Sequence, residues 1–373
     1  MMAQGWQWTP DPDFGRLRAA LLRQGEPDRV PLHDSVDIFL KKRFLGLESL
    51  EVSRSGSGMQ TSMRLPLDLE IEFAYRAGYD FVPLGASMHA RITGTSTTVA
   101  AKYAAFGDEY QERGWANEGE GIITTLREFE SFPWPDPEET DTSGFERIGP
   151  MLPPGMRVLV DHGKIFTGVW WLMGLDGFCR AVKKDPELIA RMYEKVGAAQ
   201  YRILDIATDF DCVGGVRFAD DLAYAQGLMV SPAHLRQHFF PWLKACVDLV
   251  HEKGQVFILH SDGDVRLVLE DIIAAGVDGL HPIEPKAMDI VELKRRVGHR
   301  IALCGNIDLG YTLTRGTPQE VDAEVRERIR ALAPGGGYVL GSSNSVPEYV
   351  PLENFNAMRE ACLRYGRYPI ALD

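Results

Sequence analysis

The sequence predicts a single (β/α)₈ (TIM) barrel with an N-terminal helical elaboration and an inserted irregular region. Strand-like apolar runs alternate with helical periodicity to the end of the chain, which favours parallel strands joined by helical crossovers. The 373 residues, 45% of them hydrophobic, suffice for a large core, and no Gly/Ser-rich or Pro-rich linker divides them. No GxGxxG or Walker sequence follows the first predicted strand, which argues against a nucleotide-binding open sheet. We therefore expect residues 1–373 to form one domain.

The first half of the chain is less regular than the second. Helices are predicted at residues 14–24, 67–78 and 185–209, and strands at residues 29–34, 80–85, 157–161 and 212–219. Between the second and third strands, residues 88–142 are rich in Gly, Thr and Pro. Inserted hairpins over one end of the barrel would explain this stretch.

The second half repeats one strand and one helix four times. Strands are predicted at residues 256–260, 279–283, 301–304 and 337–340, and helices at residues 232–253, 265–275, 290–297, 318–331 and 352–365. Ser231 and Pro232 form an N-cap followed by proline at the first helical position, and Gly254 ends that helix. The count of eight strands predicts closure into a barrel.

The composition excludes several partners. A formal net charge of -13, without a concentrated basic face, argues against nucleic acid and against an anionic membrane surface. The apolar stretches are too short to span a bilayer, and the N-terminus lacks the layout of a signal peptide, so we expect a cytoplasmic protein. Five cysteines without a CxxC pair do not predict a disulfide framework.

Polar side chains at the ends of the predicted strands are the candidate site, because barrel active sites collect there. His260, Glu284 and Cys304 end three consecutive strands, and their donor types suit Zn²⁺ with one position left open for substrate. Asp262 is an alternative to Glu284 as the carboxylate ligand. Acid catalysis is assigned to Asp221 or Asp262. Substrate contacts are expected from four further residues at strand ends: His33, His162, Asn306 and Ser343.

Structural interpretations compete with each of these assignments. A histidine at a strand end is often a hydrogen-bonded structural residue, and a cysteine after apolar residues is often a core thiol. Asp220 and Asp221 would point to opposite faces of a strand, so at most one faces the pocket, and Asp221 is favoured. The alternative for these acids is a solvated loop or the N-cap of the following turn. His281 is expected to pack under the site or to orient a ligand.

Several segments resemble the uroporphyrinogen decarboxylase superfamily, and in particular its methyltransferase branch. The resemblance rests on DDLAYAQGLMVSP, HSDGD, AAGVDGLHPIEP, CGNID and PGGGYVLGSSNS, with weaker likeness back to RVP at residues 29–31. It implies the same barrel. The decarboxylases carry an Arg-rich N-terminal signature for a tetrapyrrole with eight carboxylates, and RVPLHDSVDIFLKKRFLG here has no RQAGRY-type element.

The methyltransferase branch that uses coenzyme M has a His-x-Cys motif and a later cysteine near the eighth strand. Asp262 and the pair Ser342-Ser343 stand in those places here, so the pattern is more similar to O-demethylase-type members. The resemblance then implies a zinc-dependent enzyme that moves a methyl group from a small methoxylated donor to a corrinoid (cobalamin-type) cofactor carried by a separate protein. A metal-free decarboxylase and a non-catalytic ligand-binding barrel remain the alternatives.

Overall fold

The computed structural model describes residues 8–47, 54–55, 62–63, 65–88, 96–102, 110–116 and 121–371, with side chains for residues 8–47, 65–86 and 121–371. Among these residues, no helix is both long and apolar enough to cross a membrane.

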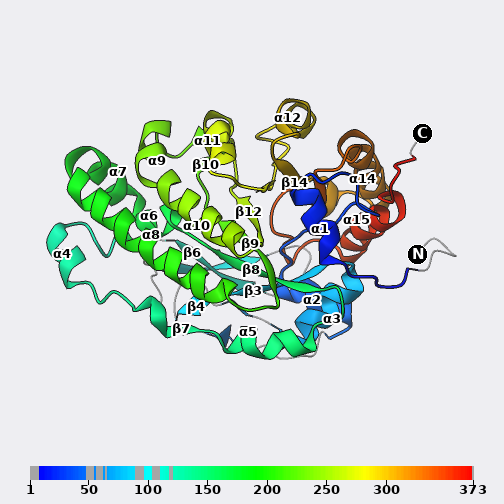
Figure 1. Ribbon diagram of the computed structural model, residues 1–373, viewed down its shortest axis with the longest axis horizontal. Coiled ribbons are helices and arrows are strands. Elements are labelled where there is room, and N and C mark those ends of the chain that lie inside the picture. The colour runs from blue at the N-terminus through cyan, green and yellow to red at the C-terminus, as the bar shows by residue number, and fades with distance from the viewer. Residues whose placement is uncertain are drawn as a thin grey trace.

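Seven parallel strands form one curled sheet with helices outside it, which confirms the predicted fold class (Figure 1). In spatial order the strands are β3 (Phe81–Gly85), β8 (Arg157–Gly163), β9 (Val213–Ala219), β12 (Val256–His260), β13 (Gly279–His281), β14 (Ala302–Ile307) and β15 (Tyr338–Ser342). Each strand except β3 is joined to the preceding one in this order by a stretch of chain that contains at least one helix. All five residues of β12 are buried, as expected for a strand covered on both faces.

The predicted first strand, residues 29–34, is an extended segment rather than a regular strand. It lies beside β15, where Leu32 bridges Leu340, and the His33 amide donates to the Leu340 carbonyl at 2.9 Å. On its other side the His33 ring stacks on Phe81 of β3, with 5.3 Å between the ring centroids. Pro31 has no N–H to give to a ladder, which accounts for the incomplete pairing. The segment thus occupies the eighth position, between the two edges of the sheet.

The helices follow the predicted order, except that one predicted helix is divided into two. Their bounds are α1 (Phe14–Leu21), α2 (Ile38–Leu45), α3 (Leu67–Ala77), α4 (Leu126–Ser131), α5 (Ser143–Ile148), α6 (Phe166–Met173), α7 (Leu175–Lys184), α8 (Pro186–Thr208), α9 (Pro232–His238), α10 (Phe240–Glu252), α11 (Leu269–Ala274), α12 (Ile290–Val297), α13 (Thr312–Arg315), α14 (Pro318–Leu332) and α15 (Leu352–Tyr365). The single helix predicted at residues 232–253 is wrong, because the chain forms α9 and α10 there. Pro241 is the physical reason, since it cannot donate a backbone hydrogen bond to the preceding turn.

Part of the predicted insertion at residues 88–142, namely residues 89–95, 103–109 and 117–120, lies outside the described residues. Within it, β5 (Ser96–Lys102) and β6 (Tyr110–Ala116) pair antiparallel, as a hairpin would. β4 (Ser87–Met88) pairs antiparallel with β7 (Thr140–Asp141), so the two ends of the insertion lie together.

Candidate metal and substrate site

Three potential metal ligands meet at the carboxyl ends of β9 and β12. Asp221 follows β9, His260 ends β12 and Asp262 comes two residues later, and one donor atom from each lies within 4.8 Å of the others. His260 Nε2 is 3.5 Å from Asp262 Oδ1 and 3.8 Å from Asp221 Oδ1. Ligand atoms in a tetrahedral zinc site are separated by roughly 3.4 Å, given bonds of about 2.1 Å. The three side chains therefore need only small movements to hold one ion.

The two carboxylates repel each other in this arrangement. The Asp262 amide donates to Asp221 Oδ1 at 3.0 Å, and Asn344 Nδ2 donates to Asp262 Oδ2 at 2.7 Å. Asp262 Oδ1 is buried and accepts no hydrogen bond from the described residues. Burial, and then the charge of Asp221, raise the pKa of Asp262 to about 7. An orphaned carboxylate oxygen and two like charges at close range are both relieved by a bound divalent cation, so these residues fit one.

A buried row of three histidines lies next to this group. His260 Nδ1 is 2.7 Å from His281 Nδ1, and the His281 and His33 ring centroids are 4.6 Å apart. Burial lowers the pKa of all three rings, that of His33 to about 3, so they are neutral. A proton on His260 Nδ1, donated to His281, leaves the His260 Nε2 lone pair facing Asp221 and Asp262. His33 thus lies near the site, one ring away from it.

Arg217, which the sequence analysis did not single out, comes from the middle of β9. It binds Asp161 of β8 through two N–H groups, with contacts of 2.9 and 3.0 Å to the two carboxylate oxygens. Its third nitrogen is 3.5 Å from His260 Nδ1. This ion pair supports the wall of the site between β8 and β12.

Glu284 and Cys304 lie outside the group of three. Glu284 Oε2 accepts from the Gly263 amide at 3.0 Å, and Oε1 pairs with Lys286 at 3.2 Å, so Glu284 supports the loop that carries Asp262. Cys304 is fully buried in β14, and a Cβ built on Gly279 would lie 3.3 Å from its Sγ. Burial raises the pKa of this thiol, which disfavours the thiolate that a metal needs.

The other predicted contacts fall in different places. Asn306 donates to the Ile283 carbonyl at 2.5 Å and so holds the loop before Glu284. The Leu309 amide donates to Ser343 Oγ at 3.1 Å. His162 Nε2 is 3.2 Å from the Gln200 carbonyl of α8, so this ring faces the helix layer rather than the group of three.

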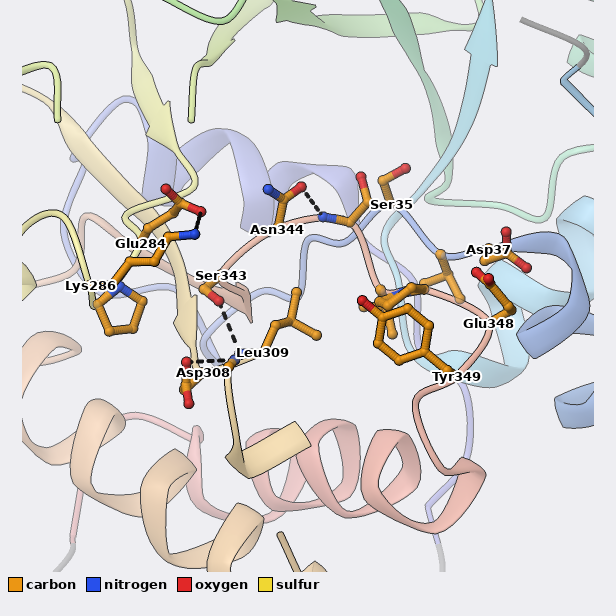
Figure 2. A pocket seen from close by; sticks show the side chains of 16 residues that line it. Ser35, Asp37, Glu284, Lys286, Asp308, Leu309, Ser343, Asn344, Glu348 and Tyr349 are labelled. Carbon is orange, nitrogen blue, oxygen red and sulfur yellow. Dashed lines mark hydrogen bonds and ion pairs between the residues drawn. The ribbon is translucent and has the colours of Figure 1, made fainter. Parts of the chain in front are cut away.

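A cavity of about 590 Å³ adjoins the group, within the range of small-molecule pockets. It is lined by residues 35–37, 284–286, 308–310 and 343–349. Figure 2 shows Glu284 and Asn344 at one side of this space and Glu348 and Tyr349 at the other. Because Asn344 also binds Asp262, the cavity and the potential metal ligands share a wall.

A parallel barrel whose strands end at a group of potential metal ligands, next to a pocket for a small molecule, is an architecture of enzymes. Residues 145–365 match the model of the family described as uroporphyrinogen decarboxylase (URO-D), and they make up more than half of the sequence. The chain belongs to this family.

Its relatives include methyltransferases and decarboxylases. A methylcobamide:CoM methyltransferase, MtaA, from Methanosarcina barkeri is 34% identical over 105 residues, which cover 28% of this chain and 30% of that protein. The chain therefore matches less than a third of the length of this relative. A uroporphyrinogen decarboxylase from Pseudoalteromonas atlantica is 23% identical over 277 residues, 69% of this chain and 73% of that protein.

Among solved structures, a methyltransferase from Methanosarcina mazei superposes with a TM-score of 0.65 and 18% identity, covering 94% of this chain and 98% of its own. At this identity the likeness establishes a shared fold.

Proposed function

We propose that this protein is a zinc-dependent methyltransferase that moves a methyl group from a small methoxylated donor to a corrinoid protein. The observation that carries the proposal is the group of Asp221, His260 and Asp262 at the mouth of the barrel. One imidazole and two carboxylates suit Zn²⁺, and three protein ligands leave a position for a substrate atom. The methyltransferase relatives support the reaction class.

In this proposal Asp221 and Asp262 act as metal ligands in place of the acid catalysis first assigned to them. A bound zinc ion would supply Lewis acidity to the ether oxygen, which makes that oxygen a better leaving group. The chain's own contribution is to position: Asn344 and the Asp262 amide orient the carboxylates, and His281 orients His260. The open mouth would receive the corrinoid protein, which brings cobalt to the methyl carbon.

The first test is zinc content by elemental analysis of the purified protein and of three variants. We expect about one zinc per chain in the wild type and in Cys304→Ala, and loss of zinc in His260→Ala and Asp262→Asn. Zinc that is lost from Cys304→Ala but retained by Asp262→Asn would assign the thiol as the ligand instead. Folded wild-type protein that takes up no zinc would refute the metal-dependent reaction.

A decarboxylase is the second candidate, because the relative from Pseudoalteromonas atlantica aligns over 69% of this chain. A decarboxylase would release CO₂ from a carboxylated substrate. Its rate should not change when a chelator removes zinc, and His260→Ala should not change the rate of the zinc-free protein. A methyltransferase would instead methylate a corrinoid protein only when zinc is present. The absorption spectrum of the corrinoid measures this methylation. A barrel without catalytic activity would bind ligand and give neither signal.

A further inference from the structure

Lys164 lies on the other side of the same mouth, immediately after β8. Its φ of 78° places it in the left-handed region of backbone conformation, which residues other than glycine rarely adopt. Among the residues with described side chains, no carboxylate oxygen is within 4.0 Å of its ammonium group. The ammonium lies instead over the ring of Trp171 in α6, 4.3 Å from the centroid.

The conformation of this loop is fixed by its neighbour at the end of β9. The Asp220 carboxylate accepts from the amides of Ile165, Phe166 and Thr167 at 2.6, 2.9 and 2.8 Å. At Gly163 a Cβ would lie 2.5 Å from the backbone of Ala219, so the chain before Lys164 passes directly against β9. The backbone is therefore held in a strained form by contacts that do not involve the Lys164 side chain, and strain of this kind collects at functional sites.

Lys164 lies at the same end of the barrel as the proposed metal ligands, because it follows β8 and Asp221 follows the neighbouring strand β9. The Lys164 charge lowers the pKa of Asp221 and contributes to the low pKa of His260. Burial lowers the pKa of Lys164 itself to about 8, against the opposite effects of Asp161, Asp221 and Asp220.

Each of these three carboxylates already has a partner. Asp161 binds Arg217, Asp220 binds three amides, and Asp221 accepts from the Asp262 amide. The charge of Lys164 is thus available to a ligand.

We propose that Lys164 is a substrate-binding residue, whose ammonium group holds an anionic oxygen of the methyl donor beside Asp221, His260 and Asp262. The inference rests on the proposed function and narrows the donor to molecules that carry a carboxylate or another oxyanion. A partly buried ammonium group that has no carboxylate partner among the described side chains gains from a charged acceptor.

Binding of 4-methoxybenzoate and of its neutral analogue 4-methoxybenzamide, measured by isothermal titration calorimetry, tests the inference without turnover. Both ligands are titrated into zinc-loaded and into zinc-free protein. The comparison distinguishes a failure of the proposed zinc site from a failure of the proposed Lys164 contact. We expect the wild type to bind the carboxylate at least about tenfold more tightly than the amide. Lys164→Met, which can still pack on Trp171, should bring this ratio close to one without changing the affinity for the amide.

Three further variants control the measurement. Lys164→Arg keeps the charge and should retain most of the preference for the carboxylate. Lys244→Met removes an exposed lysine of α10 and should behave as the wild type. Lys164→Gly relieves the left-handed strain, so it should be folded and have a higher denaturation midpoint, yet lose the preference. Equal binding of the two ligands by the wild type, no binding of either, or an unchanged ratio in Lys164→Met would overturn the inference.

Discussion

Carboxylates are paired differently at the two ends of the barrel. At the amino end of the strands, Asp80 precedes β3 and is met by two arginines, Arg16 at 2.5 Å and Arg29 at 3.3 Å. At the carboxyl end, Asp221 and Asp262 face one neutral histidine. Among the described side chains, Lys164 and Arg217 act on Asp221, and Lys286 acts on Asp262, from beyond ion-pair distance.

The difference shows which end stabilises the fold and which end is suited to chemistry. Opposite charges at the amino end stabilise each other while buried, and removing one leaves a buried charge with fewer partners. Like charges at the carboxyl end destabilise the metal-free protein and are useful only when a ligand compensates them. Substitutions at the two ends should therefore change different quantities.

The largest effect on stability is expected from Asp80→Ala. It leaves Arg16 and Arg29, which are 3% and 2% exposed in their side chains, without this partner. We expect a loss of about 3–5 kcal/mol in the free energy of unfolding, measured by urea denaturation. Asp248→Asn, which breaks an exposed ion pair with Lys244, is the matched control and should change stability little. A loss in Asp80→Ala no larger than in this control would contradict the comparison.

At the opposite end, Asp262→Asn should weaken zinc binding by at least ~100-fold, because it removes a proposed ligand. The same change should leave the metal-free protein as stable as the wild type or more stable, because it removes one of two repelling carboxylates. Zinc affinity is measured by competition with a chelator, and stability by urea denaturation in excess chelator. A clear loss of metal-free stability would mean that Asp262 supports the fold in the way that Asp80 does.

His281→Phe should weaken zinc binding by about 10–100-fold while leaving all three proposed ligands in place. The phenyl ring fills the same space but cannot accept the 2.7 Å hydrogen bond from His260 Nδ1. His234→Phe is the matched control, since His234 is also a buried histidine with a single 3.0 Å partner, the hydroxyl of Tyr193. Equal zinc affinity in the two variants would show that the tautomer of His260 is not set by His281.

The smallest expected effect is on stability and concerns His251, at the amino end of the strands. The hydrogen bond to Asp278 raises the pKa of His251 above its usual 6.5, so the pair contributes stability that is present below that pH. The contribution is lost as the pH rises through the higher pKa of the folded state. His251→Gln should therefore cost more at pH 6 than at pH 9, by under about 1 kcal/mol because the His251 side chain is 37% exposed. Urea denaturation at both pH values measures the difference, and equal costs would contradict it.

The sequence predicted the second half of the barrel well because β12, β13, β14 and β15 are buried at every residue. Such strands are short continuous apolar runs, and β12 has the bounds that its run indicates. The prediction failed where backbone chemistry interrupts a pattern. Pro31 leaves the first segment with isolated bridges, of which only one is to β15, and Pro241 divides a helix whose apolar periodicity continues through it.

The site was only partly predictable, since spacing along the chain does not give the direction of a side chain. Asp221, His260 and Asp262 are all at strand ends, as predicted, and lie together. The sequence predicted that at most one of Asp220 and Asp221 faces the pocket, but not that Asp220 would bind the α6 amides. Arg217 has no strand-end signal because it lies inside β9. Lys164 did have a strand-end signal, since it follows the apolar run at residues 157–161 at the same edge of the sheet.

The way the barrel closes has a consequence for its synthesis. The segment at residues 29–34 is made early, but its partner β15 is among the last parts of the chain. The Val30 amide also donates to Gly366 and the Tyr368 amide to Asp28, so the seam joins distant parts of the sequence. During translation the edge of this segment that binds β15 therefore stays unpaired until about residue 340 has left the ribosome. Nascent or C-terminally shortened chains would expose this edge, and we expect them to depend on chaperones where the finished barrel does not.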